Sequence, residues 1–185
     1  MTWEKSGANE LRRVFALAEL GGAGAVLEVF ADADERAALV RRFGVRAIDS
    51  LCATLRLDLV SGGAVVRIRG DLAADVVQGC VVTLEPVAAH IEQSFERRFA
   101  LGGDAGANVE VTPEDDDEPE PFDGDEIDLG ELVAEQLGVN LDPYPRRPGV
   151  LFSPEDVLGG AGAGDDGPAR SESPFAKLRD LKSEP

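Results

Sequence analysis

The stretch from Glu131 to Pro145, E-L-V-A-E-Q-L-G-V-N-L-D-P-Y-P, joins an apolar-faced helix to a proline-rich exit. Apolar residues recur here at helical spacing, namely Ile127, Leu129, Leu132, Val133 and Leu137. The pattern predicts a helix over Ile127–Gly138, capped at its start by Asp128 and ended by the glycine. Because Pro143 and Pro145 fix their own φ angles and favour extended geometry in the residues before them, a short rigid strap follows. The sequence therefore predicts a docking helix with an ordered exit.

Upstream, the sequence predicts a strand, a helix and then several antiparallel strands. Ala25–Ala31 is rich in strand formers. The next segment, capped by Asp32 or Asp34 and ended by Gly44, has helical spacing at Ala37, Ala38, Val40 and Phe43. Alternation from Ile48 predicts a long strand, and Ser61-Gly62-Gly63 is typical of a hairpin turn into a return strand. Two further strands are expected at Cys80–Leu84 and Ala88–Leu101, with a corner at Glu85-Pro86. This order is typical of an α+β fold with a mostly antiparallel sheet, one early helix and one docking helix.

The two long strands differ in how clearly their inward sides can be assigned. In the return strand, even positions carry Val66, Ile68, Leu72 and Val76, while Arg67 and Arg69 lie opposite. In the strand before it, the inward set is Ile48 and Cys52, or Leu51, Leu55, Leu57 and Leu59. The alternation alone leaves that register open by one residue.

The net charge of -18 is concentrated in one central segment. Residues 99–145 contain 15 Asp and Glu and no Lys or Arg, whereas residues 1–98 contain 12 basic and 14 acidic side chains. Crowded like charges with few large apolar residues cannot offset the entropy of ordering, so residues 102–126 are expected to form an acidic, disordered loop. One interpretation is a solubilising linker. The other is a mimic of nucleic-acid charge, in which Asp115, Asp116 and Asp117 steer a basic, lysine-rich protein toward the chain.

The same charge argues against an extended nucleic-acid footprint in the linear sequence, and no DNA partner is expected. Local arginines are the exception, and a fold that gathered them on one face would let that face contact phosphate: Arg12, Arg13, Arg36, Arg41, Arg42, Arg46, Arg97 and Arg98. No apolar run approaches the roughly 20 residues that a membrane span needs, and the N-terminus lacks the apolar block of a signal peptide. We therefore expect a cytoplasmic protein without a membrane partner.

Three segments in a fixed order carry a resemblance to a known family. They are V-V-Q-G-C-V-V-T-L-E-P-V at 76–87, the helix and strap at 131–145, and S-P-F-A-K-L-R-D-L-K at 173–182. Together they resemble the YceD family of large ribosomal RNA subunit accumulation proteins, in its alphaproteobacterial type. The resemblance implies a non-enzymatic accessory role in accumulation of the large-subunit (23S) ribosomal RNA and in ribosome biogenesis. The implied partner is that RNA or, in the alternative, a basic ribosomal protein held by an acidic binding module.

The matched segments supply the candidate contact residues. In the first segment they are Gln78, Cys80, Thr83, Glu85 and Pro86, and in the second Glu135, Gln136, Asp142, Pro143 and Tyr144. One interpretation is structural, a strand corner packed against the docking helix with the prolines shaping the turns. The other is a partner surface, since Tyr144 is the only tyrosine and an aromatic between two prolines suits stacking on a base or a partner ring.

Catalytic and metal chemistry find little support in the sequence. Cys80 would need a second cysteine at position 83, which is Thr83 here, although some relatives that the chain resembles carry one. His90 is the only histidine, and Ser94 lies on the same strand side without a third orienting group. We therefore expect no enzyme activity, no metal and no cofactor, with Cys52 and Cys80 reduced.

Four parts follow from these patterns. Residues 1–101 form the sheet-rich part of a single domain, 102–126 the acidic flexible loop, 127–148 the helix and strap of the same domain, and 149–185 a flexible tail. The tail carries Phe175, Leu178 and Leu181 at helical spacing after a Gly-rich linker. This short amphipathic element is expected to dock, either on its own domain or on a partner.

Overall fold

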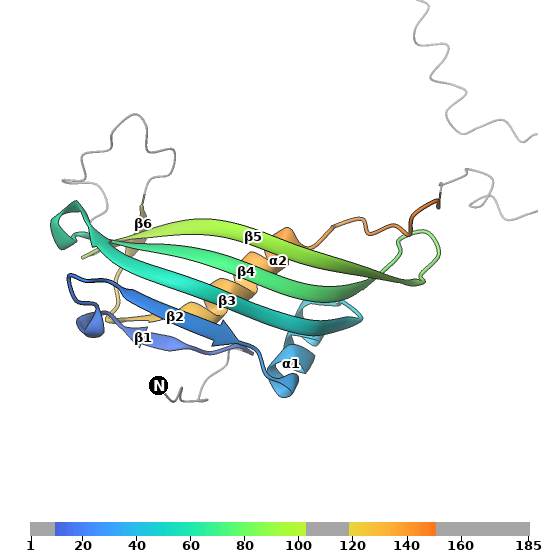
Figure 1. Cartoon of the computed structure of the whole chain (residues 1–185), viewed down its shortest axis with the longest axis horizontal. Coiled ribbons are helices and arrows are strands. Elements are labelled where there is room, and N and C mark those ends of the chain that lie inside the picture. The colour runs from blue at the N-terminus through green and yellow to red at the C-terminus, as the bar shows by residue number, and fades with distance from the viewer. Residues whose placement is uncertain (1–9, 103–118, 151–185) are drawn as a thin grey trace, which may run out of the picture. The chain divides into compact units, whose positions relative to one another are not determined.

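The computed structural model describes residues 10–102 and 119–150 of the chain. The chain divides into two units, Met1–Gly149 and Val150–Pro185. The centre of the first unit is a five-stranded sheet in the order β2-β3-β4-β5-β6 (Figure 1). The strands are β2 (Ala25–Phe30), β3 (Ala47–Val60), β4 (Val65–Gly79), β5 (Pro86–Leu101) and β6 (Glu120–Phe122). Neighbouring strands are antiparallel except β5 and β6, which pair in parallel.

The remaining elements lie around this sheet. A second sheet pairs β1 (Val14–Ala16) with β7 (Glu126–Asp128), and the helices are α1 (Ala33–Phe43) and α2 (Leu129–Asn140). Short 3-10 turns occur at Leu17–Glu19 and Ser61–Gly63. α2 lies against one face of the large sheet, and the core is built from Val, Leu, Ile and Ala of that face and of the helix (Figure 1). The predicted α+β class, with its antiparallel sheet, early helix and docking helix, is confirmed.

A β-bulge resolves the register that the alternation left open. The pairing of β3 with β4 shifts between Ile48 and Ser50, so the inward parity of β3 changes there. Ile48 is buried before the shift, and Leu51, Ala53, Leu55 and Leu57 are buried after it. Both alternatives for the inward side were thus partly right. The predicted even-numbered inward side of β4 is confirmed.

The structure differs from the sequence prediction in two further segments, one expected as a strand and one expected as a loop. Residues 80–84 form a turn, because Cys80 accepts through its carbonyl from the Leu84 N–H at 2.9 Å and Leu84 takes a left-handed φ of 60°. The last part of the segment expected as acidic loop contains β6 and the start of β7. β6 was not predictable from alternation, because it is three residues long and pairs in parallel with a distant strand.

α1 begins and ends as the sequence predicts. Asp32 accepts from the Glu35 N–H at 2.9 Å while the Glu35 carboxylate accepts from the Asp32 N–H, which completes a capping box. Gly44 ends the helix with a left-handed φ of 65°. The buried side of α1 is formed by Glu35 and Leu39, whereas Ala37 is exposed, so its predicted apolar face was placed about one residue off.

α2 has the predicted cap but a different end. The Asp128 carboxylate accepts from the N–H groups of Gly130 and Glu131 at 3.1 and 3.3 Å. The helix runs past the predicted stop at Gly138 and ends at Asn140. A Cβ at position 138 would lie 2.9 Å from the Phe43 ring of α1. The glycine is therefore required by helix packing and not by termination.

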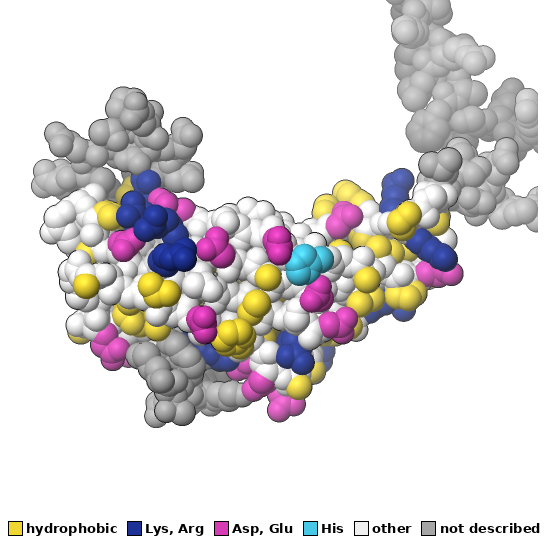
Figure 2. Space-filling view, viewed as in Figure 1, with side chains coloured by type: hydrophobic (Ala, Val, Ile, Leu, Met, Phe, Trp, Pro, Cys, Tyr) yellow, Lys and Arg dark blue, Asp and Glu magenta, His cyan; other side chains and the backbone are white. Residues whose placement is uncertain are grey.

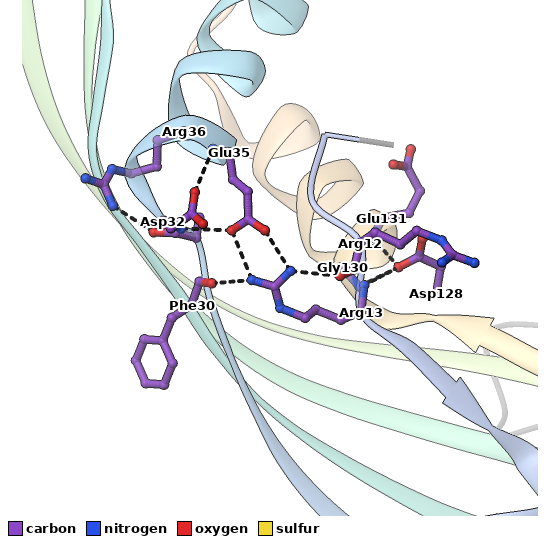
Figure 3. Close-up of polar contacts among 10 residues, drawn as sticks. Arg12, Arg13, Phe30, Asp32, Glu35, Arg36, Asp128, Gly130 and Glu131 are labelled. Carbon is purple, nitrogen blue, oxygen red and sulfur yellow. Dashed lines mark hydrogen bonds and ion pairs between the residues drawn. The ribbon is translucent and has the colours of Figure 1, made fainter. Parts of the chain in front are cut away.

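A buried ion pair holds the N-terminal segment to α1 and β2. Arg13 donates to both Glu35 carboxylate oxygens at 2.8 and 3.0 Å and to the Phe30 carbonyl at 2.7 Å (Figure 3). The Arg13 N–H donates to Asp128, and the Arg13 carbonyl accepts from the Leu129 N–H, both at 2.8 Å. Arg13 and Glu35 are only 6% and 7% exposed. One arginine thus connects the starts of both helices.

Candidate contact surface

The structure joins the two predicted contact segments into one site at the end of the sheet where β4 turns into β5. The corner comprises residues 78–86 and the strap residues 141–149. Gln78 donates to the Asp142 carbonyl at 2.9 Å, and the Val81 N–H donates to the Pro145 carbonyl at 2.8 Å. Arg147 of the strap is bound to the Glu85 carboxylate at 2.6 Å. These contacts hold the strap along the corner in a fixed position.

Cys80 lies at the centre of the corner and is fully buried. The Thr83 hydroxyl, then the backbone N–H groups of Arg147, Thr83 and Val82, lower the pKa of the Cys80 thiol to about 6. Thr83 thus occupies the place next to the sulfur where a second cysteine would stand. The Cys80 sulfur is therefore screened from solvent and is contacted by groups of both the turn and the strap.

The outer surface of this site combines apolar side chains with arginines. Four of the seven large hydrophobic side chains that are exposed among the described residues lie on the corner, the strap or the last turn of α2: Val81, Leu84, Val139 and Tyr144. Leu84 and Tyr144 are each 71% exposed. Arg46 donates to the Leu84 carbonyl, and Arg146 is exposed beside Arg147. Hydrophobic and basic side chains gather at the same end of the molecule in Figure 2.

The individual predicted residues have different places in this arrangement. Pro86 begins β5, and Tyr144 is held by its own N–H, which donates to the Asp142 carboxylate at 2.8 Å. Glu135 is exposed on α2, and the Gln136 carbonyl accepts from the Asn140 amide at 2.8 Å. The acidic steering residues and the tail residues lie outside the described residues: Asp115, Asp116, Asp117, Phe175, Leu178 and Leu181.

Sequence reasoning missed Leu84, Arg46 and Arg147 as members of this surface. The left-handed φ of Leu84, 60°, is uncommon for a residue with a Cβ and leaves its apolar side chain in solvent. Arg46 lies 38 residues from its acceptor along the chain, and Arg147 lies 62 residues from Glu85. No local pattern reports such contacts, although the pair of arginines after Pro145 was visible as the only basic run near the strap.

His90 and Ser94 do not form a nucleophile and base pair. The His90 Nδ1 lies 2.6 Å from Asp75, whereas the Ser94 hydroxyl donates to Asp71 at 2.8 Å. Asp75, followed by Glu92, raises the pKa of His90. Within the described ranges, no group of three or more His, Cys, Asp or Glu side chains is placed to hold a metal ion. None of the helices that the structure describes is long and apolar enough to cross a membrane.

The arginines that the sequence marked for one face are dispersed. Arg13 is buried against Glu35, Arg36 donates to the Ala31 carbonyl at 2.7 Å, and Arg42 is bound to Glu131 at 2.6 Å. They hold separate parts of the fold together and do not form a common surface.

A known protein family matches the part of the chain that contains this site. The family model described as "Large ribosomal RNA subunit accumulation protein YceD" matches residues 68–182, which include most of β4, the corner, α2 and the strap. The chain belongs to the YceD family. The family's description ties its members to accumulation of large-subunit ribosomal RNA. Neither the curated proteins nor the solved structures contain a match to this chain.

The match also bears on the parts of this YceD protein outside the described residues. It extends to Lys182 and thus covers the segment 173–182 that the sequence marked as a docking element. It begins at Ile68, so β1, α1, β2 and β3 precede it.

Proposed function

We propose that this YceD protein is a non-enzymatic accessory factor that promotes accumulation of 23S ribosomal RNA and ribosome biogenesis in the cytoplasm, and that the corner and strap form its contact surface. The observation that supports this proposal is the joining of two separate segments of the family match by the bonds from Gln78 to Asp142 and from Val81 to Pro145. Exposed Leu84 and Tyr144 are poorly explained by stability, since both leave apolar area in water.

The chemistry of this surface fits a contact role. A Tyr144 ring held between two prolines loses little conformational entropy on binding and offers a flat face for stacking. Arg146 and Arg147 lie next to it in the chain and can bind phosphate or carboxylate groups. No reacting group of the surface is both exposed and activated, since Cys80 is buried.

A complementation experiment tests the proposal. Cells that lack the gene receive the wild type or a variant with Tyr144→Ala and Leu84→Asn, and the ratio of 23S to 16S RNA is measured. Asparagine tolerates the left-handed backbone at position 84, so this variant should fold. The matched control is Val26→Ser with Leu59→Ser, which removes two apolar side chains of β2 and β3 that are 66% and 37% exposed.

The expected result is a low ratio with the corner variant and a normal ratio with the control. A normal ratio in both would reject the corner and strap as the contact surface. If removal of the gene itself leaves the ratio unchanged, the accessory role is wrong.

A second candidate function is an acidic module that holds a basic ribosomal protein and affects the RNA only indirectly. The observation that favours it is the absence of Lys and Arg from residues 99–145, against 15 acidic side chains. Of these, Asp123, Asp125 and Glu126 are exposed around β6 and β7. Such a field attracts lysine-rich partners over roughly 10 Å at moderate salt.

A further inference from the structure

The face of the large sheet opposite α2 carries a dense group of arginines near the hairpin that joins β3 to β4. Strand parity fixes which side chains point there, because residues on this face alternate with the buried set of each strand. The group consists of Arg56 on β3, Arg67 and Arg69 on β4, and Arg98 on β5, and we call it the arginine block. Figure 2 shows one group of Lys and Arg side chains at the left of the view, with acidic side chains spread across the middle.

Within the block, arginines lie directly opposite one another. Arg56 is paired in register with Arg69, and Arg67 is paired with Arg98. Directly opposite side chains have Cβ atoms about 4.5–5.5 Å apart, and like charges at that spacing destabilise a sheet. The two rows across β3, β4 and β5 read Asp58-Arg67-Arg98 and Arg56-Arg69-Glu96, which is four arginines against two carboxylates. The whole chain has 18 basic and 36 acidic side chains, so this composition reverses the average.

Each arginine of the block is bound to a neighbouring carboxylate, but two of them share the same one. Asp58 serves two arginines, at 3.4 Å from Arg67 and 2.8 Å from Arg69. Arg56 reaches Asp71 at 3.3 Å, and its side chain is 53% exposed. Arg98 lies 2.7 Å from Glu96. Exposed pairs of this kind contribute about 0–1 kcal/mol, so a competing anion can replace them at little cost. The Nε atom of Arg67 is buried without a hydrogen-bond partner in the part of the chain that the structure describes.

We propose that the arginine block binds the phosphate backbone of RNA. Four guanidinium groups on three adjacent strands lie on one face of the sheet, and guanidinium binds phosphate with two parallel hydrogen bonds. Phe30, 59% exposed on the same face, offers a ring to an unstacked base. The choice of RNA over an acidic protein rests on the proposed function, because the family is tied to ribosomal RNA. The pairing of β3 with β4 positions the arginine backbones before binding, which lowers the entropy lost on association.

Salt-dependent binding to a labelled single-stranded RNA oligonucleotide tests this site in the full chain. The variant is Arg56→Gln with Arg69→Gln, and the control is Arg12→Gln with Arg41→Gln, which removes the same charge from the segment before β1 and from α1. The control separates contact at the block from the general field of the protein. Thermal melts should show that both variants fold. In the block variant, loss of an opposed arginine pair relieves repulsion, and in the control neither arginine is buried.

The expected result is weaker RNA binding in the block variant than in the control. Its plot of log K against log salt should flatten by roughly 1.4, since each phosphate contact to a single strand contributes roughly 0.7. Equal weakening in both variants, or no RNA binding by the wild type, would overturn the proposal. Competition by polyglutamate as strong as that by RNA would also overturn it and would assign the block to an acidic protein.

Measuring the 23S to 16S ratio in cells, in addition to RNA binding in solution, distinguishes failure of the arginine block from failure of the proposed function. RNA binding through the block with an unchanged ratio after gene removal would reject the accessory role alone. A lowered ratio after gene removal, without RNA binding in solution, would reject the block alone.

Discussion

Replacing Arg13 by methionine should destabilise the protein far more than breaking an exposed ion pair. Arg13 and Glu35 are 6% and 7% exposed, and the change removes both bonds to the Glu35 carboxylate, at 2.8 and 3.0 Å. Glu35 would keep its bond from the Asp32 N–H but would remain charged in a buried place. Removing one partner of a buried ion pair costs about 3–5 kcal/mol, a large part of the roughly 5–15 kcal/mol that stabilises a typical domain.

Two further variants separate charge from packing. Arg13→Met with Glu35→Gln removes both charges and keeps an acceptor for the Asp32 N–H, so it should be more stable than Arg13→Met alone. Arg42→Met is the matched control, because Arg42 binds Glu131 at 2.6 Å while its side chain is 30% exposed. Its cost should stay below about 1 kcal/mol.

The pH dependence follows from the pKa of Glu35. Burial by itself raises this pKa, but hydrogen bonds from Arg13 and Asp32 outweigh burial and hold it below the ordinary value. In the wild type the pair therefore stabilises the fold above the unfolded pKa of about 4.3 and is lost as the pH falls through the folded value. Without Arg13, burial dominates and the pKa rises, so the deficit of Arg13→Met should shrink on acidification.

Urea unfolding followed by circular dichroism, at pH 7 and pH 5, measures these differences. The reasoning fails if Arg13→Met costs no more than Arg42→Met. It also fails if the double variant is less stable than Arg13→Met, because the penalty would then not arise from a stranded charge.

Three other expectations can be checked directly. Truncation after Gly149 should leave one cooperative thermal transition, since the core lies in the first unit, and loss of that transition would place the tail in the core. The folded pKa of Cys80 is lowered to about 6, so the free energy of unfolding of the wild type should rise from pH 6 to pH 9. Denaturation curves of Cys80→Ser should not show this rise. Changing Asp115, Asp116 and Asp117 to Asn should leave the melting temperature equal or slightly higher while slowing association with a basic ribosomal protein, and identical partners in pull-downs at two salt concentrations would leave the segment as a linker.

Local patterns were sufficient where the deciding interaction is close in sequence. The cap of α2 was predictable because Asp128 bonds to residues two and three positions away. The same holds for the capping box of α1 and for the inward side of β4, where alternation and burial have the same period.

Long-range contacts decided the features that were missed. Gly138 lies inside α2, where Phe43 of another helix fills the space that a side chain would need. The corner and strap meet through a bond from Gln78 to Asp142, which are 64 residues apart. The arginine block depends on the register of three strands, so Arg67 and Arg69 were predicted on the outer side of β4 while their partners across the sheet were not.

The two proposed contact surfaces lie at opposite ends of β4, and their separation determines how one RNA could engage both. The block is centred near Ile68 and the corner begins at Gln78, which is about 33 Å along a strand with a rise of about 3.3 Å per residue. A short oligonucleotide therefore reaches one surface only. A longer RNA that contacts both would gain affinity through the effective concentration at the second surface. Loss of either surface should then strongly weaken the binding of a long RNA. The binding of a short RNA should weaken only when the surface that it occupies is lost.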